Sequence, residues 1–209
     1  MTTIPEIRLR EGNRGGSNPE GRFVLYWMTA FRRLGWNFSL QHAADLAREM
    51  GKPLVILELL KVDYPFASHR LHTFLLQGMG ERSRALASGP VTHYPFAERE
   101  AGEGEGLVAA LSQHAAAVVV DDFPSFFLPS WTRRVAENLE VRVELVDSNG
   151  LLPLRVPEKT FGAAYHFRRY LQKNLPDHLP ETPDPDPLTP PPPAWEGEGD
   201  GPVPQEILG

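Results

Sequence analysis

Two arginines and a tryptophan follow the first long apolar run of the chain. Arg32, Arg33 and Trp36 lie in the stretch 29–36, directly after residues 23–28. A guanidinium group beside an aromatic ring at a strand end suits an anionic aromatic ligand or a polar interface between domains. A solvated loop without a ligand explains the same residues, so both interpretations stay open at this point.

Acidic residues follow two later apolar runs. Asp121 and Asp122 end one run, and Asp147 and Asn149 come directly after another. Acids at such positions contact a ligand hydroxyl, line a domain interface or cap a helix. The turn chemistry of Asp147-Ser-Asn-Gly is by itself a sufficient reason for those residues. A ligand or interface role and a structural role therefore remain alternatives.

Other chemical signatures are missing from the sequence. The glycines of Gly102-Glu-Gly-Glu-Gly106 do not follow the first strand and lack the spacing of a dinucleotide-binding loop. His69 and His72 share a helix face but have no third ligand nearby at metal-site spacing, and the chain has no cysteine. The sequence therefore predicts no metal site and offers no residue to which a catalytic role is assigned.

Strand-like and helix-like segments alternate along residues 22–180. Apolar runs of strand length are separated by stretches with helical spacing that end at glycine or proline. The expected strands are 23–28, 54–60, 91–96, 117–120 and 141–146, and the expected helices are 37–50, 68–86, 107–114, 128–139 and 161–174.

This alternation predicts an α/β, doubly wound domain with a five-stranded parallel sheet and helices on both faces. Strands that alternate with helices favour right-handed crossovers and hence a parallel sheet. Ligands of such domains bind beyond the carboxyl ends of the strands. In this chain those ends are the loops 28–36, 61–66, 121–128 and 147–153, which contain most of the candidate residues.

The two ends of the chain differ from this pattern. Residues 1–21 are polar and glycine-rich and are expected to form a flexible arm. Residues 181–209 hold seven acidic residues and no basic one, and nine prolines lie between 181 and 204. We expect a linker or tail that forms no core. It is either a frayed end or a connection to a second domain, since linkers mark domain boundaries.

Charge and hydropathy restrict the class of protein. The formal net charge is −6, but residues 1–180 carry 21 basic and 20 acidic residues. The domain is thus nearly neutral, unlike a stand-alone DNA-binding protein with a basic face. No apolar run reaches the ~18 residues of a membrane span, and no signal-peptide core is present. Together with the absence of cysteine, this predicts a cytoplasmic protein without a membrane partner.

Five motifs in order resemble class II cyclobutane-pyrimidine-dimer DNA photolyases. They are Phe23-Val-Leu-Tyr-Trp-Met28 with Trp36-Asn37-Phe-Ser-Leu40, Ala67-Ser-His-Arg70 with Phe74 and Gly78, Asp121-Asp122-Phe-Pro124, Val146-Asp147-Ser-Asn149 with Pro153, and Phe161-Gly-Ala-Ala-Tyr-His-Phe-Arg168-Arg-Tyr-Leu171 with Leu175-Pro176 and Leu179. The resemblance covers about residues 22–180 and implies the Rossmann-like N-terminal α/β domain of such an enzyme.

The resemblance also implies a division of labour. Members of the family bind damaged DNA, flip the dimer out of the duplex and split it with light and reduced FAD. FAD and most DNA contacts belong to a C-terminal helical domain, which we expect as a missing or separately encoded partner of this chain. We accordingly assign no catalytic residue here and expect no tight FAD binding by this chain alone.

In some family members the N-terminal domain carries an antenna chromophore, a deazaflavin or a folate. By resemblance, the antenna or interdomain surface includes Trp27, Arg32, Arg33, Trp36, Asn37, Asp121, Asp122, Asp147 and Asn149. The first hypothesis is the N-terminal domain of a photolyase for light-dependent DNA repair, as a fragment or as half of a split enzyme. The alternatives are a stand-alone chromophore- or nucleotide-binding module of the cryptochrome-like signalling type, and a relic that binds nothing.

Overall fold

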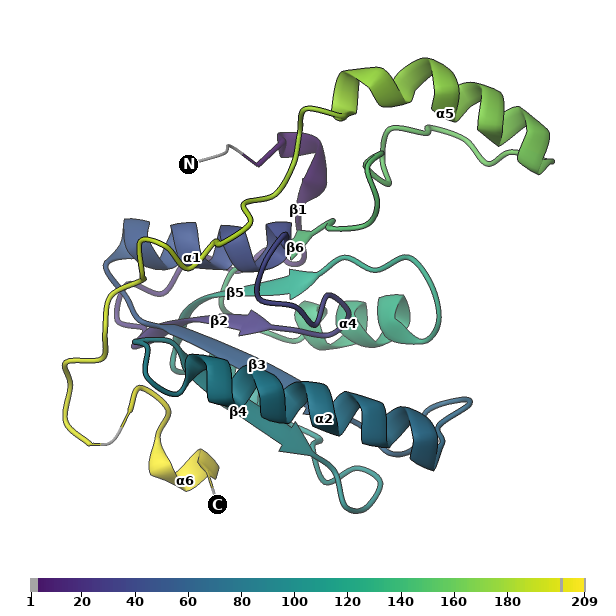
Figure 1. Cartoon of the computed structure of the whole chain (residues 1–209). Helices are drawn as coiled ribbons and strands as arrows, with labels where there is room; N and C mark the ends of the chain where they lie inside the picture. Colours follow the sequence, from purple (N-terminus) through teal and green to yellow (C-terminus); the bar gives the residue numbers. More distant parts are fainter. Residues whose placement is uncertain (1–3, 200, 209) are drawn as a thin grey trace.

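A twisted mixed sheet forms the centre of the computed structural model, which describes residues 4–199 and 201–208 (Figure 1). Within these residues the sheet has six strands in the order β1-β6-β5-β2-β3-β4. Five of them are parallel, as the sequence predicts: β2 (Phe23–Trp27), β3 (Leu54–Leu60), β4 (Thr92–Ala97), β5 (Ala115–Asp121) and β6 (Val143–Val146). The sixth, β1 (Leu9–Glu11), pairs antiparallel with β6 and corrects the predicted strand number.

Helices cover both faces of the sheet, so the predicted doubly wound α/β fold is confirmed. α1 (Phe38–Met50) and α2 (His69–Leu86) lie on one face, and α3 (Leu107–Ser112) and α4 (Leu128–Glu137) lie on the other. β3 and β4 lie on one side of β2 in the sheet, and β5 and β6 lie on the other. The strand order therefore reverses between β2 and β5, and doubly wound folds bind ligands at this topological switch. The remaining helices are η1 (Glu6–Arg8), α5 (Ala164–His178) and α6 (Gln205–Leu208).

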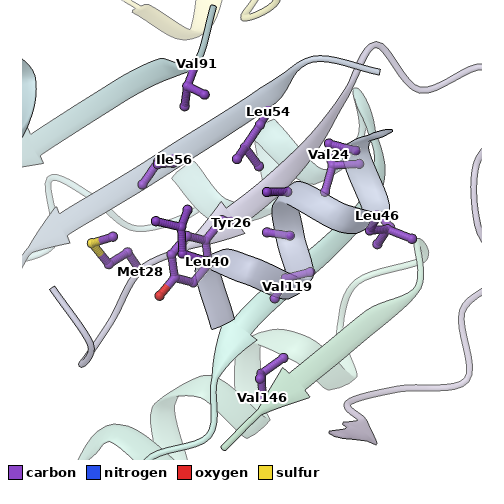
Figure 2. Packing of buried hydrophobic residues seen from close by; sticks show 14 of the residues in the cluster. Val24, Tyr26, Met28, Leu40, Leu46, Leu54, Ile56, Val91, Val119 and Val146 are labelled. Atoms are coloured by element: carbon purple, nitrogen blue, oxygen red, sulfur yellow. The ribbon is translucent and has the colours of Figure 1, made fainter. Parts of the chain in front are cut away.

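The central strands are almost entirely apolar because both of their faces are buried. The buried exceptions are Glu58 in β3 and Asp121 at the end of β5. Side chains of successive residues point to opposite faces of a strand. Tyr26 therefore packs with Leu40 of α1 and Ile56 in one cluster (Figure 2), while Trp27 belongs to the cluster under α3 and α4. The core thus consists of two layers that hold the strand ends in fixed positions.

The N-terminal segment is part of the sheet, which corrects the expected flexible arm. Leu9–Glu11 forms the edge strand β1, and the buried Arg8 guanidinium donates hydrogen bonds to the carbonyl oxygens of Asp147 (3.2 Å) and Leu151 (2.9 Å). An edge strand with unpaired N–H and C=O groups is a liability, and β1 covers that edge of β6. No local sequence pattern predicts that β1 pairs with β6, because the paired residues lie more than 130 positions apart in the sequence.

The proline-rich segment also packs on the domain, contrary to the expected linker or tail without a core. The backbone N–H of Trp36 donates to the Asp184 carbonyl at 2.9 Å, and the Arg48 guanidinium donates to the Pro187 carbonyl at 2.6 Å. Leu188 packs against the α1 cluster, and Val203 is buried in the opposite cluster. Leu188 and Val203 of this segment therefore contribute apolar side chains to the two layers of the core.

Replacing Val203 by alanine is expected to lower the free energy of unfolding by about 2 kcal/mol. Two buried methyl groups are removed at roughly 0.8 kcal/mol each, and a small cavity adds to the cost. Chemical denaturation monitored by circular dichroism measures the change. Leu179→Ala is the control, because that side chain is 48% exposed. Equal, small effects of the two substitutions would mean that the segment is a loose tail.

Candidate functional site

Asp121, at the end of β5, anchors the loop that follows β2. Its Oδ2 accepts hydrogen bonds from the backbone N–H groups of Thr29, Ala30 and Phe31 at 2.7–3.0 Å. Its Oδ1 accepts a hydrogen bond of 2.7 Å from the Tyr26 hydroxyl. Burial, followed by the charge of Asp121, raises the pKa of Tyr26 well above its usual range. The Asp121 carboxylate therefore positions the loop at the topological switch.

Asn37 continues this anchoring at the start of α1. Its Oδ1 accepts hydrogen bonds from the backbone N–H groups of Ser39 (3.0 Å) and Leu40 (3.3 Å), as the predicted N-cap requires. Its Nδ2 donates to the carbonyl oxygens of Phe31 (2.9 Å) and Arg33 (3.1 Å). The side chain is fully buried and also donates to the Tyr26 hydroxyl of β2 at 3.2 Å, so it joins the loop, the helix and the sheet.

Asp122, Asp147 and Asn149 form a second structural group at the neighbouring carboxyl ends of β5 and β6. Asp122 accepts two hydrogen bonds from Arg10 of β1 at 2.6 and 2.9 Å, and the Asn149 amide donates to the Asp122 carbonyl at 2.7 Å. The Asp147 carboxylate accepts the N–H of Asn149 at 2.8 Å and lies 3.8 Å from Arg8. These contacts fix the turn and the N-terminal strand.

Arg33 and Trp36 lie on the side of the loop that faces α1 and the proline-rich segment. The Arg33 Nε donates to the Trp36 carbonyl at 3.0 Å, and its guanidinium lies 5.6 Å from the ring centre of Phe31. Trp36 adopts a left-handed backbone conformation (φ 53°) and its side chain is 55% exposed. A role for these two residues in ligand binding or a domain interface stays a prediction.

Arg32 points the other way, into a buried ionic network. Its guanidinium donates to Glu58 Oε1 at 2.9 Å and to the Leu59 carbonyl at 3.1 Å. Glu58 is fully buried in β3 and also binds Arg82 of α2 and His93 of β4. The network joins the loop after β2, two strands and α2, so it holds Arg32 at the carboxyl edge of the sheet.

A cavity of about 400 Å³ lies at this edge, beside Arg32. It opens between the loops that follow β2, β3 and β5, together with α2 and α4. The volume falls in the range of small-molecule sites, roughly 300–1,000 Å³. The walls are mainly apolar and aromatic, and the lining residues are Thr29, Ala30, Arg32, Leu59, Leu60, Lys61, Tyr64, Leu71, Leu75, Phe123, Phe126, Phe127, Leu128 and Trp131.

Aromatic rings form one continuous wall of this cavity. The rings of Tyr64 and Phe127 are stacked with centroids 5.4 Å apart and an interplanar angle of 27°. The ring centroids of Phe127 and Trp131 are 6.0 Å apart. Trp131 in turn packs edge to face against the buried Trp27, with the ring centroids 4.9 Å apart. Such rings present flat, polarisable surface to a planar ligand.

The polar groups of the cavity are few and mainly cationic. Arg32 lies on one side, and the Lys61 ammonium lies 5.9 Å from the Trp131 ring centre. Lys61 has only long contacts to carboxylates, at 3.4 Å to Asp63 and 3.5 Å to Glu98. The buried Tyr64 hydroxyl has no hydrogen-bond partner among the described residues, and burial raises its pKa. These features fit a planar, partly anionic ligand that also accepts or donates one hydrogen bond.

Sequence reasoning located this edge but missed most of the cavity. Among the candidate residues, Arg32 lines the cavity and Trp27 lies behind its wall. The other seven lie outside the cavity lining, and their role in an antenna or interdomain surface stays a prediction. The missed residues are Lys61, Tyr64, Phe127 and Trp131. A usable signal existed, because aromatic residues are concentrated in two loops, 64–66 and 123–127, that follow strands of the sheet.

Comparison with known proteins decides the family. The sequence model of the DNA photolyase family matches residues 24–191, which is most of the chain. The chain belongs to the DNA photolyase family. It is 31% identical over 193 residues to the deoxyribodipyrimidine photo-lyase of Oryza sativa subsp. japonica, covering 85% of this chain and 36% of the relative.

Two further photo-lyases match over the same kind of span. The protein of Methanothermobacter thermautotrophicus is 27% identical over 166 residues, covering 78% of this chain and 36% of the relative. The protein of Arabidopsis thaliana is 27% identical over 166 residues, covering 77% of this chain and 32% of the relative. The chain thus spans about a third of the length of these photolyases, and the comparisons favour the photolyase hypothesis over the signalling module.

Neither a metal centre nor a membrane-spanning helix is found in the described part of this photolyase domain. No group of three or more His, Asp or Glu side chains is arranged to hold a metal ion in residues 4–199 and 201–208. Over the same two ranges, no helix is long and apolar enough to cross a membrane.

Proposed function

We propose that this chain is the antenna and scaffold part of a photolyase that repairs cyclobutane pyrimidine dimers, of class II by its motifs. The observation that carries the proposal is the aromatic cavity at the carboxyl edge of the sheet, in a chain whose relatives are deoxyribodipyrimidine photo-lyases. A chromophore bound there absorbs light and passes the excitation energy to FAD in the helical part of the enzyme. The ligand is a deazaflavin or a folate.

The residues of the cavity suit such a chromophore. Stacked Tyr64 and Phe127, with Trp131 beside them, provide flat contact for a fused ring and exclude water from it. Arg32 and Lys61 supply positive charge for a carboxylate, phosphate or anionic ring oxygen. The Glu58 network keeps Arg32 in place before the ligand arrives, which lowers the entropic cost of binding.

The rim of the cavity supports the proposal of an FAD-binding partner. Phe66 and Phe126 are 83% and 62% exposed, and their rings lie 5.9 Å apart. Both residues have positive φ angles, 68° and 67°, which are strained for a bulky residue. Two apolar rings held toward solvent by strained backbone are suited to contact with a second protein surface. We assign that surface to the helical FAD-binding part, through which damaged DNA is bound and repaired.

Replacing Trp131 by alanine is expected to weaken chromophore binding at least about tenfold. The substitution removes an aromatic wall from the ligand, and a decrease of about 1.4 kcal/mol in binding free energy corresponds to a factor of ten. Fluorescence titration of the purified chain with a deazaflavin, and separately with a folate, measures the affinity and tells the two ligands apart. FAD itself is expected to show no stoichiometric binding in the same titration.

Trp36→Ala is the matched control for that titration, because Trp36 lies outside the cavity lining on the other side of the loop. A thermal melt of both variants checks that they remain folded. If Trp36→Ala weakened binding and Trp131→Ala did not, the chromophore would bind on the α1 side and this assignment would be wrong. Binding of neither ligand by the wild-type chain would also contradict the antenna role.

A further inference from the structure

Helix α5 and the segment before it carry an excess of positive charge. Residues 155–178 contain two acidic residues, Glu158 and Asp177, and five basic residues: Arg155, Lys159, Arg168, Arg169 and Lys173. The rest of residues 1–180 holds sixteen basic and eighteen acidic residues. The near-neutral charge of the domain therefore hides a basic segment, and Figure 1 shows that α5 stands apart from the sheet.

The basic residues of α5 face solvent, whereas two of its aromatic residues, Phe167 and Tyr170, contact the preceding segment. The ring centroid of Phe161 lies 5.4 Å from that of Phe167 and 5.1 Å from that of Tyr170. The Tyr170 hydroxyl donates a hydrogen bond to the Val156 carbonyl at 2.8 Å. The segment that precedes α5, which includes Val156 and Phe161, thus packs on that side of the helix. Arg168, Arg169 and Lys173 are exposed.

Two of these three cations, Arg169 and Lys173, are four residues apart and are therefore neighbours on the helix surface. Arg168 lies about 100° around the helix from Arg169, and Asp177 follows Lys173 by four residues. None of the ion pairs found within residues 4–199 and 201–208 includes them. The Arg169 guanidinium donates a hydrogen bond of 2.7 Å to the Tyr165 hydroxyl and lies 5.5 Å from that ring centre. Tyr165 therefore holds one guanidinium in place without neutralising it.

We infer that the outer face of α5 binds the phosphate backbone of duplex DNA. Clustered lysine and arginine side chains with an interleaved aromatic residue are the footprint of nucleic-acid contact. Contacts of this kind are independent of base sequence and release counterions from the DNA. The inference rests on the proposed function only for the choice of DNA as the polyanion, and it adds a contact from the α/β domain to those of the helical part.

The test is dark fluorescence anisotropy of the full chain with a labelled, undamaged duplex of about 20 base pairs at several salt concentrations. The triple variant R168A/R169A/K173A is expected to bind at least tenfold more weakly at low salt. The slope of log affinity against log salt concentration should become shallower by about 3, since each phosphate that is no longer neutralised accounts for about 0.9. Replacement of the arginines in R168K/R169K should retain most of the affinity, because lysine also binds phosphate as a point charge.

The control variant R70A/R84A/R133A removes the same charge from exposed positions on α2 and α4, and it should bind like the wild type. Equal decreases in affinity in both triple variants, or no binding by the wild-type chain at low salt, would overturn the inference. It would also be overturned if the α5 variant kept its DNA affinity but no longer bound a separately expressed FAD-binding part. The assay uses neither chromophore nor flavin, so its failure leaves the antenna proposal to its own titration.

Discussion

Replacing Glu58 by glutamine is expected to lower the free energy of unfolding by about 4 kcal/mol at neutral pH. The Glu58 carboxylate is fully buried and accepts hydrogen bonds from Arg32 (2.9 Å) and Arg82 (2.8 Å to Oε2), with His93 at 3.2 Å. Removing one partner of a buried ionic network leaves the others uncompensated and costs roughly 3–5 kcal/mol. Urea denaturation at pH 7 measures the change.

The same carboxylate is expected to make the protein sensitive to acid. Burial opposes its ionisation, but hydrogen bonds from His93 and Arg82 and the charge of Arg32 prevail and lower the pKa of Glu58 to about 2. Because this value lies below the usual pKa of about 4.5, protons bind the unfolded chain more readily. The stabilisation is complete above about pH 4.5 and is lost as the pH falls toward 2, by about 3 kcal/mol in total.

Two comparisons make the Glu58 prediction specific. The stability of Glu58→Gln should depend less steeply on pH between about 4.5 and 2 than that of the wild type. The pH dependence that remains comes in part from Glu144, whose pKa is also lowered. Glu103→Gln should have little effect at any pH, because its pair with Arg99 is exposed to solvent. A wild-type stability that stays constant through this pH window would contradict the assigned ionisation of Glu58.

Replacing Asp121 by alanine is expected to cost about 4 kcal/mol and to loosen the loop after β2. Its carboxylate accepts four hydrogen bonds: from the backbone N–H groups of Thr29, Ala30 and Phe31, and from the Tyr26 hydroxyl. Each buried donor left without a partner costs about 1–3 kcal/mol, although water entering the space offsets part of the total. Denaturation curves measure the cost, and hydrogen exchange of residues 29–31 should become faster.

Asp122→Ala is the matched control for this second prediction. Asp122 is the next residue, but its pair with Arg10 is partly exposed and its removal should cost less than about 1 kcal/mol. Asp121→Asn should fall between the two, because one acceptor oxygen remains. If Asp121→Ala and Asp122→Ala were equally mild, the loop would be positioned by other contacts. Because Arg32 belongs to this loop, Asp121→Ala should also weaken the proposed chromophore binding.

Local patterns in the sequence were sufficient for the central architecture. The continuous apolar run of β2, the N-cap Asn37 and the C-terminal Gly51 of α1 act on their own neighbours, so their effect is legible without a structure. Alternation of strand and helix then restricts the topology to a doubly wound sheet. The same order places the loops 28–36 and 121–128 at one edge, and five motifs in order along residues 22–180 indicate the photolyase family.

Contacts between distant segments were decided only by the tertiary structure. Arg8 and Val203 lie in segments whose composition is typical of disorder, and both are buried because the sheet edge and the core layer provide partners elsewhere in the chain. Asp121 likewise anchors a distant segment, since three of its donors come from a loop about 90 residues away. Residue type and spacing report what a side chain is able to do, whereas the folded chain determines which partner satisfies it. The aromatic cavity also depends on the tertiary structure, because the three separate loops that line it come together only when the sheet has formed.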